Sequence, residues 1–311
     1  MTQPDYSTTR NLITVKPACF DRCTKGLNTL LKTPDNEYKI AEGGLRLKGL
    51  YKSSSEEKPL ITVVTVVYNG AEYLEDTIKS VIEQAYDNVE YIIVDGGSTD
   101  GTLDIIKKYE DAIDYWVSEP DKGIYDAMNK GVDLGSGDWI NFMNADDYFI
   151  NNNAINKINF RECDFVYGNI LLKDKDYVIS SGKEITLDDL KFKGICHQSV
   201  FVKKTVFVRL GSFNLAYAVA ADYDFFVRVF KSAFVKKYIN TNIAYMRMGG
   251  VSDSGYIKSL DEKLSIIKIN FPLKTYAAAF VYQYFYERPR NKVRAALMKA
   301  GLIKYWRMLR D

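Results

Sequence analysis

Four short runs of apolar and β-branched residues in the first half of the chain dominate its hydrophobic pattern. Runs this apolar are typical of strands that are covered on both faces of a sheet. These predicted strands lie at 60–68, 89–94, 113–117 and 139–143. Between them, apolar residues recur at helical spacing with charged residues in the gaps. The predicted helices lie at 74–85, 103–109 and 124–131. The alternation predicts a parallel, twisted sheet with right-handed crossovers.

The pattern changes after residue 147. Segments 165–172 and 198–202 are apolar enough for strands, but only short connections surround them. Segment 221–230 has helical spacing, with Phe226, Val229 and Phe230 on the side expected to be buried. The second half is therefore expected to be mixed rather than a continuation of the regular strand–helix alternation.

The composition is that of a globular protein with a substantial core: 311 residues, 47% hydrophobic and 26% charged. Lys and Arg number 42 against 40 Asp and Glu, so no overall positive field favours nucleic acid. The charge is uneven, because 271–311 holds nine basic residues and two acidic ones. Four cysteines without a CxxC pair, and a start unlike a signal peptide, predict a cytoplasmic protein.

Two adjacent carboxylates, Asp146 and Asp147, come shortly after the apolar run at 139–143. In open α/β sheets, ligands bind at the edge formed by the carboxyl ends of the strands. Neighbouring carboxylates repel each other, and a divalent cation between protein and ligand relieves that repulsion. Oxygen ligands favour Mg²⁺ or Mn²⁺ over zinc. The alternative interpretation of this pair alone is a solvated loop after a strand.

The common nucleotide-binding signatures are missing from the sequence. It contains neither G-x-G-x-x-G nor G-x-x-x-x-G-K-[ST], and its first predicted strand ends in Tyr68-Asn-Gly70. The chain has one histidine, His197, and no G-x-S-x-G elbow to supply a matching nucleophile. We interpret His197 as a hydrogen-bonded structural residue. Acid–base chemistry would then fall mainly to carboxylates.

Five ordered motifs go beyond these separate signals. They are Tyr68-Asn-Gly70, Asp95-Gly-Gly-Ser-Thr-Asp-Gly101, Asp121-Lys-Gly-Ile-Tyr-Asp-Ala-Met-Asn-Lys-Gly131, Asn144-Ala-Asp-Asp147 and Ala221-Asp-Tyr-Asp224. In this order and spacing, the chain resembles a family 2 glycosyltransferase of the GT-A fold, of the bacterial surface-polysaccharide type. The resemblance implies an α/β, Rossmann-like, mostly parallel twisted sheet with a mixed acceptor-side half and a C-terminal helical tail.

The resemblance also implies a division of the chain. The expected parts are an N-terminal extension and linker (1–59), a GT-A catalytic domain (60–250) with nucleotide-sugar (60–150) and acceptor (151–250) halves, and a basic, aromatic helical tail (251–311). Within this frame the family's activity would be inverting transfer of a sugar from a nucleotide-sugar donor, expected to be UDP-linked. The acceptor would be a saccharide or a lipid-linked molecule, and Mg²⁺ or Mn²⁺ would assist.

The family's roles carry over residue by residue. Asp222 matches the catalytic base. Asp146 and Asp147 would hold the metal, because the first acid of the family's Asp-x-Asp motif is Asn144 here. The residues expected to bind the donor are Tyr68, Asp95, Asp121, Lys122, Asp126, Asn129 and Asp146. Tyr68 would stack on the base, and a lysine would supply positive charge because Met128 stands where relatives often have Arg.

There are two alternative functions, and the sequence favours the first of them less. A sugar-nucleotide nucleotidyltransferase would need a glycine-rich, Arg-bearing loop after the first strand, which Tyr68-Asn-Gly-Ala-Glu72 does not provide. A non-catalytic glycan- or nucleotide-binding protein would explain the departures at Asn144, Ala221 and Met128. For the tail, a helix from Asn291 either docks on anionic lipid at the inner face of the cytoplasmic membrane or packs on the domain.

Overall fold

The computed structural model describes residues 5–20, 23–24, 27–172, 177–179, 184–192, 194–247, 256–289 and 292–293. The strands are β1 Cys23–Thr24, β2 Leu27–Asn28, β3 Ala41–Gly43, β4 Ile61–Val67, β5 Val89–Asp95, β6 Tyr115–Ser118, β7 Trp139–Phe142, β8 Tyr148–Phe149, β9 Phe165–Leu172, β10 Tyr177–Ile179, β11 Val200–Lys203 and β12 Lys236–Met246. The α-helices are α1 Leu74–Ile82, α2 Thr102–Lys108, α3 Ile124–Leu134, α4 Lys204–Leu210, α5 Ala221–Lys231, α7 Tyr256–Asn270 and α8 Leu273–Tyr282. Shorter helical turns are η1 Ala18–Phe20, η2 Leu45–Lys48, η3 Glu110–Ala112, η4 Ile155–Lys157, η5 Asp189–Lys191, η6 His197–Ser199 and the π-helical η7 Gln283–Glu287.

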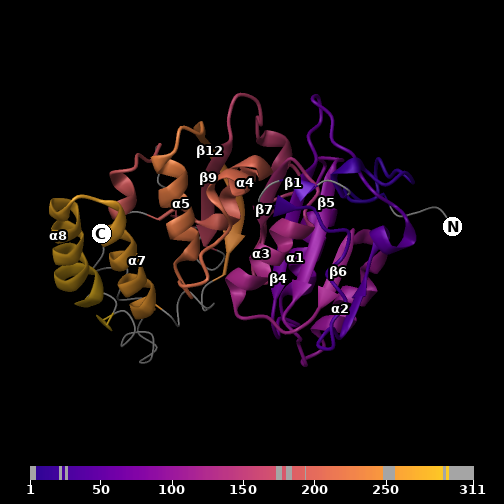
Figure 1. The fold of residues 1–311 in the computed structure, drawn as a ribbon, viewed down its shortest axis with the longest axis horizontal. Coiled ribbons are helices and arrows are strands. Elements are labelled where there is room, and N and C mark those ends of the chain that lie inside the picture. Colours follow the sequence, from indigo (N-terminus) through magenta and orange to yellow (C-terminus); the bar gives the residue numbers. More distant parts are fainter. Residues whose placement is uncertain are drawn as a thin grey trace.

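One ten-stranded sheet runs through the molecule (Figure 1). Its strands lie in the order β3-β6-β5-β4-β7-β11-β9-β12-β8, and β10 pairs with β9. The first four predicted strands are confirmed as β4, β5, β6 and β7, which pair in parallel with β4 at the centre. The helices α1, α2 and α3 connect them. The predicted parallel half is therefore correct.

Alternate residues of the central strand β4 face two separate cores. Ile61 and Val63 belong to the cluster that α1 and α2 cover, whereas Val64 and Val66 belong to the cluster that α3 and α5 cover. All four side chains are buried, which explains why β4 has no polar face. Gly131 brings α3 close to the sheet, because a Cβ atom there would lie 2.3 Å from Val64 Cγ1.

The second half of the sheet is mixed, as predicted. β11 lies antiparallel between β7 and β9, and β12 runs parallel to β9. The predicted strand at 198–202 begins two residues later, at Val200, because 197–199 form the turn η6. The side-chain amide of Asn141 holds this turn against β7 by donating to the carbonyl oxygens of Gln198 and Val200, at 3.0 and 2.9 Å.

The N-terminal residues add to the same sheet. β3 pairs antiparallel with β6 at its edge. Two buried ion pairs fasten this segment to the strands, Arg46–Glu90 at 2.5 Å and Lys52–Asp114 at 3.0 Å. Removing one partner of a buried pair leaves an uncompensated charge, so these contacts make the segment's position specific.

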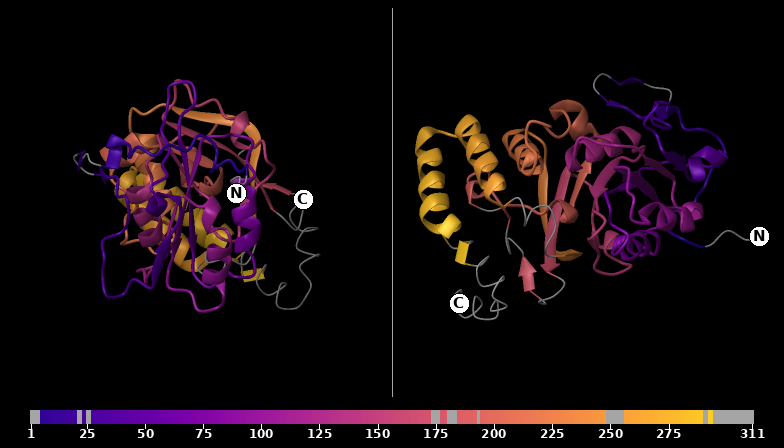
Figure 2. Two further views of the ribbon diagram at one scale, coloured as in Figure 1. Left: turned by 90° about the vertical axis from the view of Figure 1, so that its right-hand side faces the viewer. Right: turned by 90° about the horizontal axis from the view of Figure 1, so that it is seen from below.

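The helices α7 and α8 form a pair at the opposite end of the molecule, with α7 beside α5 (Figures 1 and 2). Apart from residues 292–293, the helix predicted from Asn291 onward lies outside the described residues. Among the described helices, none combines the length and the apolar character that crossing a membrane requires.

Candidate functional site

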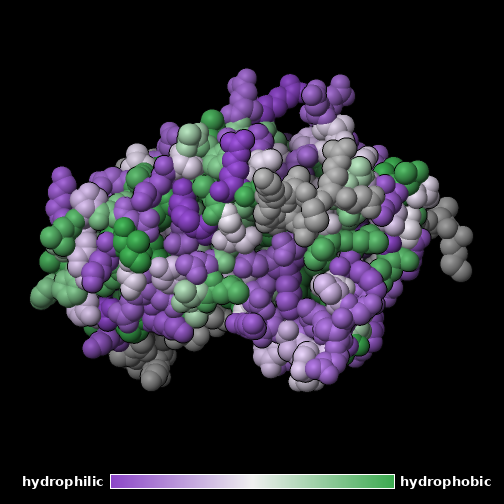
Figure 3. Space-filling view, viewed as in Figure 1, coloured by the Kyte–Doolittle hydropathy of each residue, from purple (hydrophilic) through white to green (hydrophobic). Residues whose placement is uncertain are grey.

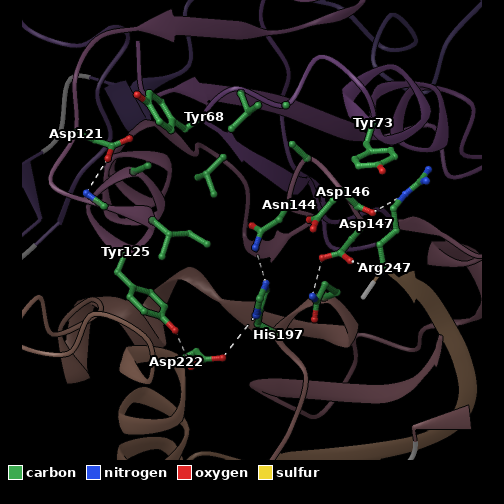
Figure 4. A pocket seen from close by; sticks show the side chains of 18 of the residues that line it. Tyr68, Tyr73, Asp121, Tyr125, Asn144, Asp146, Asp147, His197, Asp222 and Arg247 are labelled. Atoms are coloured by element: carbon green, nitrogen blue, oxygen red, sulfur yellow. Dashed lines mark hydrogen bonds and ion pairs between the residues drawn. The ribbon is translucent and has the colours of Figure 1, made fainter. Parts of the chain in front are cut away.

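A cavity of about 560 Å³ opens where β4 and β7 end, between the two halves of the sheet (Figure 4). This is the carboxyl edge of the parallel strands, where the sequence predicted a site. The predicted residues that line the cavity are Tyr68, Asp121, Asp146, Asp147 and Asp222. Its size lies in the range of small-molecule sites in proteins.

Four of the predicted donor-binding residues do not belong to its lining: Asp95, Lys122, Asp126 and Asn129. Asp95 ends β5 and is fully buried. Its Oδ2 accepts hydrogen bonds from the backbone N–H groups of Gly97 and Ser98, at 3.2 and 3.1 Å, and from the hydroxyl of Ser118, at 2.6 Å. In this structure Asp95 shapes the turn after β5.

Asp126 and Asn129 make contacts within the protein on α3. Asp126 Oδ2 accepts the backbone N–H of Lys122 at 3.0 Å, at the start of the helix. The amide of Asn129 makes two hydrogen bonds of 2.9 Å to the backbone of Phe213, one as donor and one as acceptor. Both side chains therefore make their hydrogen bonds within the protein, and neither lines the cavity.

Tyr68 and Asp121 form one end of the cavity (Figure 4). Tyr68 is 68% exposed, so its ring is accessible to a stacking partner. A Cβ atom on Gly96 would lie 2.5 Å from Asp121 Oδ2 and 3.4 Å from the Tyr68 ring. Because Gly96 has no side chain, Asp121 can lie beside Tyr68.

Hydrogen bonds join the turn after β5 to the loop after β4. Asn69 has a positive φ of 50°, a conformation that Asn tolerates better than most residues. Its side-chain oxygen accepts the Thr99 N–H at 2.9 Å, and the Asp100 carboxylate accepts the Ala71 N–H at 3.0 Å. Because these contacts join the first two motifs, the Tyr68 loop has a defined position.

Asp146 and Asp147 lie at another side of the cavity (Figure 4). Burial and the neighbouring charge of Asp146 raise the pKa of Asp147 to about 7. Burial also raises the pKa of Asp146. Gln198 donates to Asp147 Oδ2 at 2.6 Å, so the turn η6 holds Asp147 in place. Together the raised pKa values indicate a site that positive charge would stabilise.

Asn144 lines the cavity beside this pair. Its side-chain Oδ1 is buried and has no hydrogen-bond partner, which is unusual in a native fold. Within the described residues, no three His, Cys, Asp or Glu side chains form a ready-made metal site. Mg²⁺ commonly uses one or two carboxylates and completes its shell with substrate phosphates and water. The carboxylates of Asp146 and Asp147 fit a cation bound in that way.

Arg247, at the end of β12, supplies a cation to the lining. Its guanidinium donates to the Asp146 carbonyl oxygen at 3.1 Å and to Asp76 Oδ2 at 2.7 Å, and its centre lies 4.2 Å from the centroid of the Tyr73 ring. Lys130, by contrast, pairs with Glu119 at 2.8 Å. An arginine fixed beside the acid pair is suited to recognising phosphate oxygens.

Asp222 lies in the first turn of α5 and faces the acid pair across the cavity (Figure 4). Its Oδ1 accepts the Tyr223 N–H at 2.8 Å and lies 2.9 Å from the Tyr125 hydroxyl. Although burial alone would raise the pKa of Asp222, His197 and Tyr125 hold it below its ordinary value. The carboxylate is therefore ionised at neutral pH and able to accept a proton.

His197 is hydrogen-bonded, as expected, and it also lines the cavity. Its Nδ1 lies 3.6 Å from Asp222 Oδ2, and its Nε2 lies 3.0 Å from Asn144 Nδ2. The next residue in the chain is Gln198, which contacts Asp147. The turn η6 therefore connects the base candidate with the acid pair.

A carboxylate from α7 supports the loop before Asp222. Glu262 accepts the backbone N–H groups of Ala218, Val219 and Ala220 at 3.0, 2.9 and 2.9 Å. These groups precede the first turn of α5, where donors lack helical partners and negative charge is favourable. Because Ala218 and Val219 line the cavity, α7 helps to define its shape.

The residues that sequence reasoning missed are Tyr73, Tyr125, Gln198, Arg247 and Glu262. Tyr125 lies inside a recognised motif, and Gln198 follows the single histidine, so these two carried a local signal. The others carried none, because their partners are distant along the chain.

Comparisons with known proteins identify the family and the fold. The family described as "Glycosyl transferase family 2" matches residues 62–204. A "PGL/p-HBAD biosynthesis glycosyltransferase" of Mycobacterium bovis (strain BCG / Pasteur 1173P2) is 34% identical over 207 residues, which cover 63% of this chain and 80% of the relative.

Two solved structures share the fold. TarS 1–349 of S. aureus, in complex with UDP-GlcNAc, superposes with a TM-score of 0.58 at 17% identity, over 73% of each chain. The mannosyltransferase PcManGT of Pyrobaculum calidifontis, in complex with GDP-Man and Mn²⁺, gives a TM-score of 0.56 at 15% identity, over 81% of this chain and 84% of its own. The architecture is that of the GT-A fold.

Proposed function

The chain belongs to glycosyl transferase family 2, and from this premise we propose that it is an inverting enzyme of bacterial surface-polysaccharide synthesis. It would move a sugar from a nucleotide-sugar donor, UDP-linked, to a saccharide or lipid-linked acceptor. The donor class is supported by the complexes of the two structural relatives with UDP-GlcNAc and GDP-Man. The biosynthetic role is supported by the name of the mycobacterial relative.

One observation carries the proposal. An ionised carboxylate, Asp222, and a pair of adjacent acids, the half-buried Asp146 and the buried Asp147, line the same cavity from different halves of the fold. Single displacement needs this separation, because the acceptor must approach the sugar from the face opposite the leaving group. A sugar between the two groups would meet both requirements.

In the proposed reaction, the acceptor hydroxyl gives its proton to Asp222 while its oxygen attacks the anomeric carbon. The bond between that carbon and the diphosphate oxygen breaks, and the nucleoside diphosphate leaves with the bonding electrons. Attack from the opposite face inverts the anomeric configuration. General-base assistance of this kind typically contributes about 10²–10⁴-fold to the rate.

Residues at the two ends of the cavity would bind different parts of the donor. Tyr68 would stack on the base beside Asp121, and Arg247 would contact the diphosphate. A divalent cation, when bound by Asp146 and Asp147, would offset the negative charge that grows on the leaving diphosphate. The raised pKa of Asp147, about 7, favours such a partner, because the acids are costly to ionise without one.

Asp222→Asn tests the base. We expect kcat to fall by about 10²–10⁴-fold with little change in donor affinity. The assay is release of nucleoside diphosphate, with and without acceptor, over a panel of nucleotide sugars. Asp104→Asn, an exposed position on α2, is the matched control and should behave as wild type. Full turnover by Asp222→Asn would remove this residue from the mechanism, and donor binding without any turnover by the wild type would favour the non-catalytic alternative.

Asp146→Asn tests the metal role. Donor binding by the wild type should strengthen on addition of Mg²⁺ or Mn²⁺ and weaken with a chelator. The variant should lose this dependence, since an amide binds these cations less strongly than a carboxylate. Titration calorimetry with a nucleoside diphosphate measures the effect. Identical metal dependence in both proteins would contradict the assignment.

We also propose that the C-terminal part contacts an anionic membrane at its cytoplasmic face. Large apolar side chains are exposed along α8 and η7, including Leu273 at 79% and Phe285 at 77%. Figure 3 shows apolar surface at this end of the molecule. The excess of basic residues in 271–311 would attract anionic lipid. This surface would bring the site to a lipid-linked acceptor.

Vesicle co-sedimentation tests this contact. Full-length protein should bind vesicles with anionic lipid more strongly than zwitterionic ones, and deletion of 290–311 should weaken binding. Leu273→Glu should weaken it further, whereas Val15→Glu, at an equally exposed position far from the tail in sequence, should not. Equal binding by the full-length and deleted proteins would exclude the role.

A further inference from the structure

His197, the single histidine of the chain, lines the cavity between Asn144 and Asp222. His197 contacts Asn144 through Nε2 and approaches Asp222 through Nδ1 (Figure 4). Its side chain is 16% exposed, and its backbone belongs to the anchored turn η6. A ring that Asn144 holds at one nitrogen, on a turn that is itself anchored, has little freedom to rotate.

The contact with Asn144 sets the tautomer of the ring. Asn144 Nδ2 is a donor only, so Nε2 at 3.0 Å must be the acceptor and carries no proton. In a neutral imidazole the proton then resides on Nδ1, the atom that faces Asp222. The chain therefore presents an N–H group to one oxygen of the base candidate.

The other oxygen of Asp222 is already engaged. Tyr223 N–H donates to Oδ1, and the Tyr125 hydroxyl lies within hydrogen-bond distance of it. The separation of 3.6 Å between His197 Nδ1 and Asp222 Oδ2 is longer than a hydrogen bond. Catalytic contacts of this kind are often long without ligands and shorten in the reacting complex.

We propose that His197 is a positioning residue for Asp222, and that Asn144 acts through it by fixing the Nδ1–H tautomer. This inference rests on the proposed function, in which Asp222 takes the acceptor's proton. His197 itself is not the base, because Nε2 is occupied by Asn144 and Nδ1 carries a proton. Asp222 receives the proton on Oδ2, the oxygen that faces His197 Nδ1.

In this scheme Asn144, which stands at the first position of the family's Asp-x-Asp motif, has a specific role. A carboxylate at position 144 could only accept a hydrogen bond, so it would draw the ring proton to Nε2. The lone pair of Nδ1 would then face the Asp222 carboxylate and repel it. Asn144 and His197 therefore act as a matched pair.

Nuclear magnetic resonance of the full-length protein, labelled with ¹⁵N-histidine, tests the tautomer directly. With one histidine in the sequence, the spectrum contains a single ring and needs no assignment. We expect Nδ1 to be protonated and Nε2 to be bare near neutral pH. Asn144→Asp should move the proton toward Nε2. Protonation of Nε2 in the wild type would overturn the inference without reference to any activity.

Two variants of the same chemical kind test the effect on Asp222. In His197→Asn, the amide nitrogen occupies the place of Nδ1 and can still donate to Asp222. In His197→Gln, the amide lies near the place of Nε2 and loses that contact. We expect His197→Gln to lower kcat by about 10- to 100-fold at unchanged donor KM, as loss of an orienting partner typically does, and His197→Asn to retain most of the rate.

A packing role would give the opposite order, because Asn leaves the larger void. Equal rates in the two variants, or a rise in KM at constant kcat, would overturn the inference. The proposed function fails separately, if wild-type protein releases no nucleoside diphosphate in response to acceptor. Unfolding midpoints of both variants within the range of wild type establish that the comparison concerns folded protein.

Discussion

Glu262→Gln tests how the C-terminal helices support the site. Glu262 lies on α7, and its carboxylate accepts three backbone N–H groups just before α5, at 2.9–3.0 Å. Asp222 lies in the first turn of α5, two residues after the last of these groups. The substitution keeps the size of the side chain but replaces one acceptor oxygen with an NH₂ group. At least one backbone donor then faces another donor.

The magnitude follows from the hydrogen bonds. Each hydrogen bond to a charged acceptor contributes about 1.5–3 kcal/mol, and each neutral one about 0.5–1.5 kcal/mol. Two weakened bonds and one lost bond, at a side chain that water partly reaches, should lower the free energy of unfolding by about 2–3 kcal/mol. Because Ala218 and Val219 line the cavity, we also expect kcat to fall on the order of 10-fold through misplacement of Asp222.

Urea unfolding followed by fluorescence, together with the nucleoside diphosphate assay, measures both effects. Glu56→Gln, at an exposed position in the segment before β4, is the matched control and should change neither. The midpoint should shift at constant slope, so that the change reports stability alone. If Glu262→Gln unfolds at the same urea concentration as Glu56→Gln, the carboxylate does not support the loop, and the reasoning is wrong.

Three further predictions concern positions near the sheet. Gly96→Ala should weaken donor binding several-fold with little effect on the unfolding midpoint, because its Cβ would meet Asp121 Oδ2 at 2.5 Å; unchanged affinity in calorimetry would contradict the role of that close approach. Gly131→Ala should destabilise the protein by about 1–3 kcal/mol in urea, since its Cβ would meet Val64 Cγ1 at 2.3 Å; an unchanged midpoint would show that α3 can shift away. Burial raises the pKa of Asp133 to about 6. The folded state therefore binds its proton more tightly, so this group's contribution to stability is present below about pH 4 and lost as the pH rises through about 6. Asp133→Asn should remove that loss and stabilise the protein by about 1 kcal/mol at pH 7, allowing for solvent screening; a wild-type pH profile in the variant would refute this.

The parallel half of the fold was predictable because its signals are local. Each buried strand is a run of apolar residues, and each crossover helix shows its own periodicity, so neither depends on distant contacts. The carboxyl ends of β4 and β7 meet at one edge in any such sheet, which is why Tyr68, Asp146 and Asp147 could be expected near each other. The functional roles of these residues stay predictions.

Other parts of the site depend on contacts that no local pattern announces. The turn that follows Asp95 encloses its carboxylate, which the sequence did not indicate, and the predicted contact of Asp95 with the donor stays a prediction. Arg247 reaches Asp146 only because β12 joins the far side of the sheet, and Glu262 reaches the start of α5 from a helix outside the matched family region. The division of the chain into separate parts also stays a prediction, although β3 pairs with β6.

The sequence by itself determined the order of the strands and helices, the family, and which acids lie at one edge of the sheet. These features depend on neighbouring residues, because apolar runs indicate buried strands and short motifs indicate the family. The tertiary structure alone decided which side chains face one another across the cavity. His197 meets Asp222 and Asn144 because the turn η6 packs against β7, β9 and β12, which brings residues 25 and 53 positions away to the same ring. The physical reason is that a hydrogen bond or an ion pair depends on distance and direction in space. Those are set by the packing of whole elements and not by spacing along the chain.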